Sequence, residues 1–262
     1  MNVKTFRRLT MILVTAILIG VSVIVGLLIY KSCDKEKRTE YEYSSADVQK
    51  YVDYLYCDDD STYLMLVNLD NSIGTYEPSN LLKTDLIKDC KIANQTYYVE
   101  ERTLYALTAM LIEAKACGYD KIRITSAYRS YTKQNSIFNN YIAEEMEKDP
   151  TLTREAAEEI VKKYSNPPGR SEHQTGLTVD FYAEDDGSTV LNTGFAYTDE
   201  GRWLAANCHK FGFVLRYGAD KTDITGISYE PWHFRYVGIE HAAKMKELNM
   251  CLEEYIEYLG KQ

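Results

Sequence analysis

Hydrophobic residues first form one long run near the start of the chain. Residues 9–30 are almost continuously apolar and carry no charge, and a helix of about 20 apolar residues crosses the hydrocarbon core of a bilayer. The run ends in Ile29-Tyr30-Lys31, without the small residues of a signal-peptide cleavage site. We therefore predict an uncleaved transmembrane anchor over residues 9–30 at the cell membrane. Residues 1–8 form a short basic cytoplasmic tail, which favours an extracytoplasmic position for the large remainder.

The next thirty residues are polar, and the pattern of a folded domain begins after them. Residues 31–60 start with several charged side chains and end in an acidic run, which favours a linker that separates the domain from the bilayer. A short helix over residues 46–56 fits within this linker. Residues 61–262 are expected to form one extracytoplasmic domain.

Two periodicities alternate along residues 61–262. Apolar residues three or four positions apart predict helices, whereas alternating or short continuous apolar runs predict strands. Several strands that look antiparallel, with helices grouped apart from them, indicate an α+β fold: a small, mainly antiparallel sheet flanked by helices. The predicted helices cover residues 101–117, 131–148, 153–164, 202–210 and 238–259, and the predicted strands cover residues 64–68, 122–126, 177–183, 211–217 and 229–237.

Composition narrows the classes of partner. The net charge is -9 and no cluster of Lys and Arg follows residue 40, so a nucleic-acid partner is excluded, because binding to phosphates requires clustered positive charge. The six cysteines show no CxxC spacing, which argues against a cysteine zinc site. Free buried thiols are the expectation for an exported domain of this size, and the spacing leaves any disulfide pairing open.

Two short segments about fifty residues apart carry the candidate chemistry. The first contains His173 and, seven positions later, Asp180; the second begins with Glu230 and ends with His233. Two histidines and one carboxylate, with an open position for water, are the donor set of a hydrolytic zinc site, and a further carboxylate can act as the base. In one continuous strand His173 and Asp180 would face opposite sides, so we predict a turn at Gly176.

Other polar residues carry weaker signals by themselves. His209 and His241 lie in charged, helical surroundings and are expected to be ordinary packed or solvent-exposed residues. Arg129 follows a predicted strand and precedes a predicted helix. Such strand ends often position binding groups, although an Arg there is more often part of a surface ion pair.

Three motifs together resemble a known family. Ser-x-His-x(6)-Asp from Ser171, Glu-x-x-His from Glu230, and Tyr-Arg-Ser-x(3)-Gln from Tyr128 resemble the VanY-type D-alanyl-D-alanine carboxypeptidases, which are LAS zinc metallopeptidases with a hedgehog-like fold. The resemblance runs from about Leu64 to about Lys246. Thr178 departs from the pattern, because the family more often has Ala there, but a small residue at this position should be tolerated.

The resemblance implies a ligand set and a base. His173, Asp180 and His233 would bind one zinc ion per chain, and Glu230 would be the general base. Zinc lowers the pKa of a bound water from about 15.7 to about 7, so a carboxylate can accept its proton at neutral pH and pass it to the leaving amine.

The resemblance also implies a substrate pocket. Arg129 would anchor the terminal carboxylate of the substrate or stabilise the tetrahedral oxyanion, since a permanently charged guanidinium suits either role. Gln134 and Ser171 would line the same pocket.

These expectations point to a membrane-anchored zinc D,D-carboxypeptidase that removes the terminal D-Ala from peptidoglycan stem peptides. The motifs do not separate this activity from an L,D-carboxypeptidase or a peptidoglycan endopeptidase of the same fold. A domain that binds wall peptides without cleaving them is a further alternative, against which the presence of Glu230 argues.

Overall fold

A computed structural model describes residues 41–56, 61–184 and 191–261. The predicted tail and transmembrane anchor, residues 1–8 and 9–30, lie outside the described residues. Among the helices that the structure describes, none combines the length and apolar character needed to cross a bilayer.

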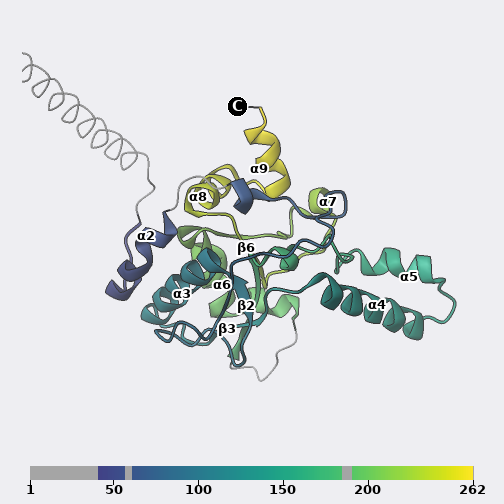
Figure 1. Cartoon of the computed structure of the whole chain (residues 1–262), viewed down its shortest axis with the longest axis horizontal. Coiled ribbons are helices and arrows are strands. Elements are labelled where there is room, and N and C mark those ends of the chain that lie inside the picture. Colours follow the sequence, from purple (N-terminus) through teal and green to yellow (C-terminus); the bar gives the residue numbers. More distant parts are fainter. Residues whose placement is uncertain (1–40, 57–60, 185–190, 262) are drawn as a thin grey trace, which may run out of the picture. The chain divides into compact units, whose positions relative to one another are not determined.

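The described part of the chain has an α+β architecture, as predicted (Figure 1). Its main sheet has four antiparallel strands in the order β3-β4-β6-β5, and a separate sheet pairs β1 with β2. The central strands β4 and β6 are buried along their whole length, so the site residues that they carry lie inside the domain. The strands are β1 (Leu81–Lys83), β2 (Tyr98–Glu100), β3 (Ile122–Ser126), β4 (Thr178–Ala183), β5 (Phe213–Leu215) and β6 (His233–Tyr236).

Helices surround the sheet, and two of them form a separate hairpin. Figure 1 shows α4 and α5 extending away from the sheet, and they pack on each other through a small apolar cluster of their own around Phe138 and Val161. Ser130 and Thr153 cap the two helices by accepting backbone N–H bonds. The α-helices are α2 (Val52–Leu55), α3 (Glu101–Ala116), α4 (Tyr131–Lys148), α5 (Arg154–Val161), α6 (Asp199–Asn207), α7 (Thr222–Thr225), α8 (Ile239–Leu248) and α9 (Leu252–Leu259), and the 3-10 helices are η1 (Ala46–Tyr51), η2 (Ser61–Leu64), η3 (Glu172–Thr175), η5 (Thr193–Tyr197) and η6 (Cys208–Phe211).

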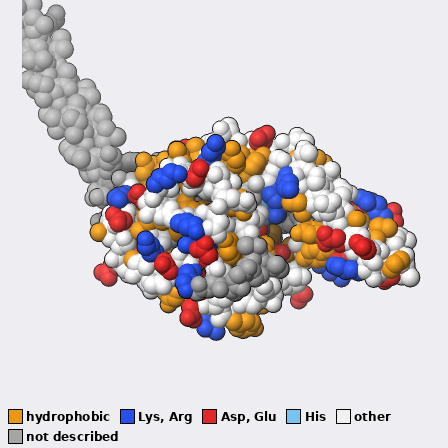
Figure 2. Space-filling view, turned by 90° about the horizontal axis from the view of Figure 1, so that it is seen from below, with side chains coloured by type: hydrophobic (Ala, Val, Ile, Leu, Met, Phe, Trp, Pro, Cys, Tyr) orange, Lys and Arg blue, Asp and Glu red, His pale blue; other side chains and the backbone are white. Residues whose placement is uncertain are grey.

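The main hydrophobic core joins α3 to the sheet. Leu104, Leu107 and Met110 of α3 are fully buried in the same cluster as Phe181 of β4 and Phe234 of β6. On the face shown in Figure 2, basic and acidic side chains are interspersed, with hydrophobic ones between them. The cysteines that the structure describes are free thiols, but only Cys208 and Cys251 among them are buried.

The start of the compact unit corrects the predicted linker. Residues 41–56 pack against α3, where Val48 and Leu55 are buried in the main core. The backbone N–H groups of Ser44 and Ser45 donate to the carboxylate of Glu113 at 2.6 and 2.9 Å. The folded unit therefore begins at Tyr41 rather than after residue 60.

The strand predicted over residues 64–68 does not form. The 3-10 helix η2 ends at Leu64, and the Nη2 atom of Arg235 donates to the carbonyls of Tyr63 and Met65 at 3.1 and 2.9 Å. A neighbouring strand would need such carbonyls as acceptors, so the buried guanidinium takes the place of a sheet partner.

The single closing helix predicted over residues 238–259 is also wrong. The chain breaks into α8 and α9 at Asn249, whose φ of 50° is in the left-handed region. Asn tolerates that conformation better than most residues and commonly ends helices in it. As a separate helix, α9 places Glu253 of its first turn against Arg216, which follows β5.

A turn at Gly176 lies between the two halves of the first motif, as the spacing predicts. The 3-10 helix η3 ends there, and Gly176 adopts a φ of 73° before β4 begins. This turn reverses the direction of the chain enough for His173, within η3, and Asp180, within β4, to face each other.

We expect Gly176→Ala to lower the free energy of unfolding by at least about 2 kcal/mol. A residue with a Cβ atom loses about 1–2 kcal/mol in the left-handed region, and here the new atom would lie 2.9 Å from Cδ2 of Leu81 and 3.1 Å from the backbone N of Glu100. Gly226→Ala is the matched control, because its φ is +72° in open space. Chemical denaturation measures both, and equal losses would show that the contacts add nothing.

Candidate active site

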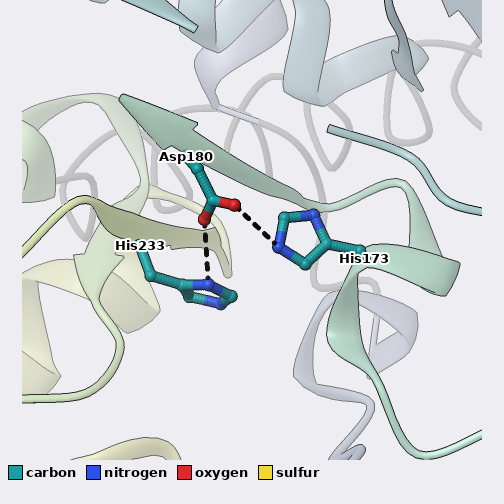
Figure 3. Close-up of side chains that lie close together, drawn as sticks. All are labelled: His173, Asp180 and His233. Carbon is teal, nitrogen blue, oxygen red and sulfur yellow. Dashed lines mark ion pairs between the residues drawn. The ribbon is translucent and has the colours of Figure 1, made fainter. Parts of the chain in front are cut away.

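His173, Asp180 and His233 converge from three different elements. Asp180 lies directly opposite His233 in the register of β4 and β6, and η3 brings His173 to the same place (Figure 3). Nε2 of His173 is 3.2 Å from Oδ2 of Asp180, and Nδ1 of His233 is 3.0 Å from Oδ1 of the same carboxylate. All three side chains are buried, and their candidate donor atoms lie within 4.8 Å of one another.

These three side chains fit a zinc ion. The Nδ1 atom of His173 lies 2.7 Å from the carbonyl of Ala127; a carbonyl only accepts, so Nδ1 carries the proton and Nε2 offers its lone pair to the site. Oδ1 of Asp180 is buried, and apart from the contact with Nδ1 of His233 it has no hydrogen-bond partner among the described residues. Two imidazoles and a carboxylate with unused acceptor capacity form the three-ligand set of a catalytic zinc site.

The surroundings of His233 carry an excess of negative charge. Its ring lies 3.4 Å from a carboxylate oxygen of Glu230 and 3.6 Å from one of Glu172, besides the contact with Asp180. Burial lowers the pKa of His233, but Asp180 and Glu172 outweigh this and raise the pKa to about 9. A site that favours a proton so strongly also favours a metal cation in its place.

Glu230 lies beside this cluster but outside it. It precedes β6 in a turn, where its N–H donates to the carbonyl of Tyr217 and its own carbonyl accepts from the N–H of His233, both at 3.1 Å. Burial raises the pKa of Glu230 to about 7, against the opposing effects of His233 and Arg129. A carboxylate with a pKa near neutrality is suited to take up and release a proton.

A cavity of about 350 Å³ opens onto the cluster. Tyr141 of α4 and Tyr164, which follows α5, contribute to its wall, so the helical hairpin forms part of the pocket. Ser171, only 4% exposed, also lines it.

Arg129 lines the same cavity. Its backbone N–H donates to the carbonyl of His173 at 3.1 Å, which fixes the start of its side chain beside the metal-ligand cluster. Nη1 donates to Oγ of Ser126 at 3.2 Å, whereas Nε has no hydrogen-bond partner among the described residues. The guanidinium therefore keeps donor capacity for a ligand.

Gln134 occupies a different place from the one predicted. It is fully buried and is not among the residues that line the cavity. Its amide instead donates to the carbonyl of Asn166 at 2.6 Å and to Oγ of Ser165 at 3.4 Å, and both of these residues line the cavity. The structure corrects its position from the wall of the pocket to the layer directly behind it.

Sequence reasoning missed a group of charged residues behind His233. Glu172, Arg216 and Arg235 have side chains with 0% exposure, and Glu172 forms an ion pair with each of the two arginines. The available signal was that each arginine lies within a predicted strand, at residues 211–217 and 229–237, since Arg is almost never fully buried without a partner.

Comparisons with known proteins agree with this geometry. A family model described as VanY, D-alanyl-D-alanine carboxypeptidase, matches residues 96–239, which is more than half of the chain. The chain belongs to the VanY family. YodJ of Bacillus subtilis (strain 168), which is named as a carboxypeptidase, is 38% identical over 199 residues, covering 76% of this chain and 68% of YodJ. The chain spans about half the length of two enterococcal relatives named D-alanyl-D-alanine carboxypeptidase.

Two solved structures are similar to this chain along most of their length. The LdcB LD-carboxypeptidase is 36% identical with a TM-score of 0.63, covering 73% of this chain and 84% of LdcB. A vancomycin-resistance D,D-pentapeptidase VanY in complex with Zn(II) is 35% identical with a TM-score of 0.61, covering 74% of this chain and 99% of that one. With the ligand set described above, this VanY-family chain is a zinc metallopeptidase.

Proposed function

We propose that this zinc metallopeptidase is a D,D-carboxypeptidase that removes the terminal D-Ala from peptidoglycan stem peptides. The observation that carries the proposal is that Arg129 lines the same cavity as the metal-ligand cluster and Glu230. A positive, fork-shaped donor next to a hydrolytic centre selects a substrate whose carboxylate ends close to the scissile bond.

The residues of the chain divide the reaction between them. A bound zinc ion supplies a Lewis acid that lowers the pKa of water from about 15.7 to about 7. Glu230 accepts the proton of the attacking water and then donates it to the leaving amine. Arg129 holds the terminal carboxylate, so the peptide carbonyl one residue from the chain end faces the cluster. Glu230 and the three metal-ligand side chains are themselves buried, which strengthens the electrostatic interactions among them.

An L,D-carboxypeptidase is the second candidate. The likeness to the LdcB LD-carboxypeptidase is as strong as the likeness to the D,D-pentapeptidase VanY, with TM-scores of 0.63 and 0.61. Both reactions release a terminal D-amino acid, and they differ in the configuration of the residue before the scissile bond. A carboxylate anchor and a metal-based hydrolytic centre serve both equally.

Defined stem peptides distinguish these activities. The zinc-loaded protein is incubated with a pentapeptide ending in D-Ala-D-Ala, with the tetrapeptide that lacks its last residue, and with the pentapeptide amidated at its C-terminus. We expect release of D-Ala from the pentapeptide and little from the amide, measured by mass spectrometry. Release from the tetrapeptide alone would favour the L,D activity, internal fragments would indicate an endopeptidase, and no cleavage of any peptide would overturn the proposal.

Loss of Arg129 should lower kcat/KM for the unblocked peptide. The expected decrease corresponds to about 3 kcal/mol of lost transition-state stabilisation, the scale of one lost electrostatic donor. Arg129→Ala is compared with Arg202→Ala, whose side chain is 61% exposed on α6. If Arg129 anchors the terminal carboxylate, the loss disappears with the amidated peptide; if it stabilises the oxyanion, the loss persists. Near-normal kcat/KM for the unblocked peptide would remove Arg129 from the site.

We also propose that residues 9–30 anchor the protein in the cell membrane with the peptidase domain outside. The support is the uncharged apolar run and the short basic tail before it. We expect the full chain to be recovered in the membrane fraction. We also expect protease added to intact cells stripped of their cell wall to digest the peptidase domain. Recovery of the full chain in the soluble fraction would contradict the anchor.

A further inference from the structure

Four charged residues form a compensated network behind the metal-ligand cluster. Oε1 of Glu172 accepts from Nε of Arg216 at 2.8 Å and lies 3.0 Å from Nη1 of Arg235. Nη1 and Nη2 of Arg216 donate to both carboxylate oxygens of Glu253 at 2.8 and 2.6 Å. Two carboxylates and two guanidiniums balance in charge, and Glu253, 14% exposed, is the member closest to the surface.

The network reaches the metal site through one imidazole nitrogen. Oε2 of Glu172 lies 3.6 Å from Nε2 of His233, and neither atom has a hydrogen-bond partner among the described residues. Nδ1, on the other side of the same ring, faces Asp180. A carboxylate that pairs with two guanidiniums thus faces Nε2 of His233, whereas Nδ1 of the same ring faces Asp180.

We propose that Glu253, on α9, is a positioning residue for the zinc site that acts through Arg216 and Glu172 on His233. Glu172 keeps the proton of His233 on Nε2, which leaves the lone pair of Nδ1 for the metal and orients the ring. Arg216 holds Glu172 in the required place only while its other face is fixed by the paired bonds to Glu253. The inference rests on the zinc site and not on which peptide bond is cleaved.

Charge and geometry act in the same direction. Without the carboxylate of Glu253, Arg216 keeps a single ionised partner and is free to draw Glu172 away from His233. The network also changes from neutral to a net positive charge, which disfavours a cation at the adjacent site. Both effects weaken zinc binding, although Glu253 touches neither His233 nor the other two ligands.

Glu253→Gln tests the inference, with Glu257→Gln as matched control. Glu257 is on the same helix, with a side chain that is 69% exposed and pairs with Lys261. Zinc affinity is measured by competition with a chromogenic chelator, and the melting temperature of the metal-free protein is measured alongside. We expect about tenfold weaker zinc binding in Glu253→Gln, the scale found for partners of metal ligands, and no change in Glu257→Gln. A lower melting temperature with unchanged zinc affinity would show that Glu253 only docks α9 and would overturn the inference.

Two further variants test the path. Arg216→Lys keeps the charge but cannot bridge two carboxylates, so it should lose as much zinc affinity as Glu253→Gln.

Adding Glu253→Gln to Glu172→Gln should give no further loss of zinc affinity, because the effects of substitutions that act through one pathway do not add. Additive losses would overturn the route through Glu172. If Glu172→Gln fails to fold, the visible spectrum of the cobalt-substituted Glu253→Gln protein replaces it, and a spectrum identical to wild type counts against the inference. Because these readouts use no peptide, they stand even if the proposed activity fails.

Discussion

Asp180→Asn is expected to lower zinc affinity by more than about 100-fold and to remove peptidase activity at ordinary zinc concentrations. Loss of a residue that only supports a ligand weakens metal binding by about 10–100-fold, and Asp180 is a predicted ligand itself. The substitution preserves the shape of the side chain but removes the negative charge that lies between His173 and His233. The effect should therefore exceed that of any supporting residue.

The measurement is zinc content after dialysis against a weak chelator, followed by activity with added zinc. Wild-type protein stripped of metal should recover its activity, whereas Asp180→Asn should not recover at the same zinc concentration. Asp199→Asn is the control, because this carboxylate is 79% exposed on α6 and is not one of the three clustered donors. A variant of Asp180 that retains one zinc ion with wild-type affinity would show that this carboxylate is not a ligand.

Local signals explain why much of the fold is predictable from the sequence. The predicted bounds of β3 and α4 match the structure, and those of α3 differ by one residue. Ser130 and Thr153 mark the starts of their helices because each side-chain oxygen accepts a hydrogen bond from the backbone N–H three residues later. In the site, the spacing of His173 and Asp180 was sufficient to require a turn, and Gly176 was the residue able to make it.

Signals that depend on distant residues explain the errors. The strand expected near Leu64 was lost to Arg235, which is about 170 residues further along the chain and takes the carbonyls of that segment. The burial of Glu172 also depends on distant residues, because its partners come from β6 and from the segment after β5. A sequence shows that such charges need partners once they are buried, but it does not show which partners the fold brings together.

Glu230→Gln should leave zinc bound and lower kcat by about 10³- to 10⁴-fold. Glutamine preserves the size of the side chain but cannot accept a proton, so the general-base contribution, on the order of 10²- to 10⁴-fold, is lost. The upper part of that range is expected here because one carboxylate serves both proton transfers. Glu230 lies 3.4 Å from Nδ1 of His233 but is not among the three clustered donors, so metal content should match the wild type.

The combined pattern of zinc content, kcat and KM separates the base from the ligands. Asp180→Asn loses metal and activity together, whereas Glu230→Gln loses kcat alone, and KM should change little because Arg129 still holds the peptide. Glu247→Gln, with a side chain 66% exposed on α8, controls for the loss of one negative charge. Near-normal kcat in a zinc-loaded Glu230→Gln protein would mean that another group accepts the proton. In the described part of the cavity wall the remaining carboxylates, Glu172 and Asp180, are held by the arginines and histidines around them, which leaves Glu230 as the carboxylate best placed for that role.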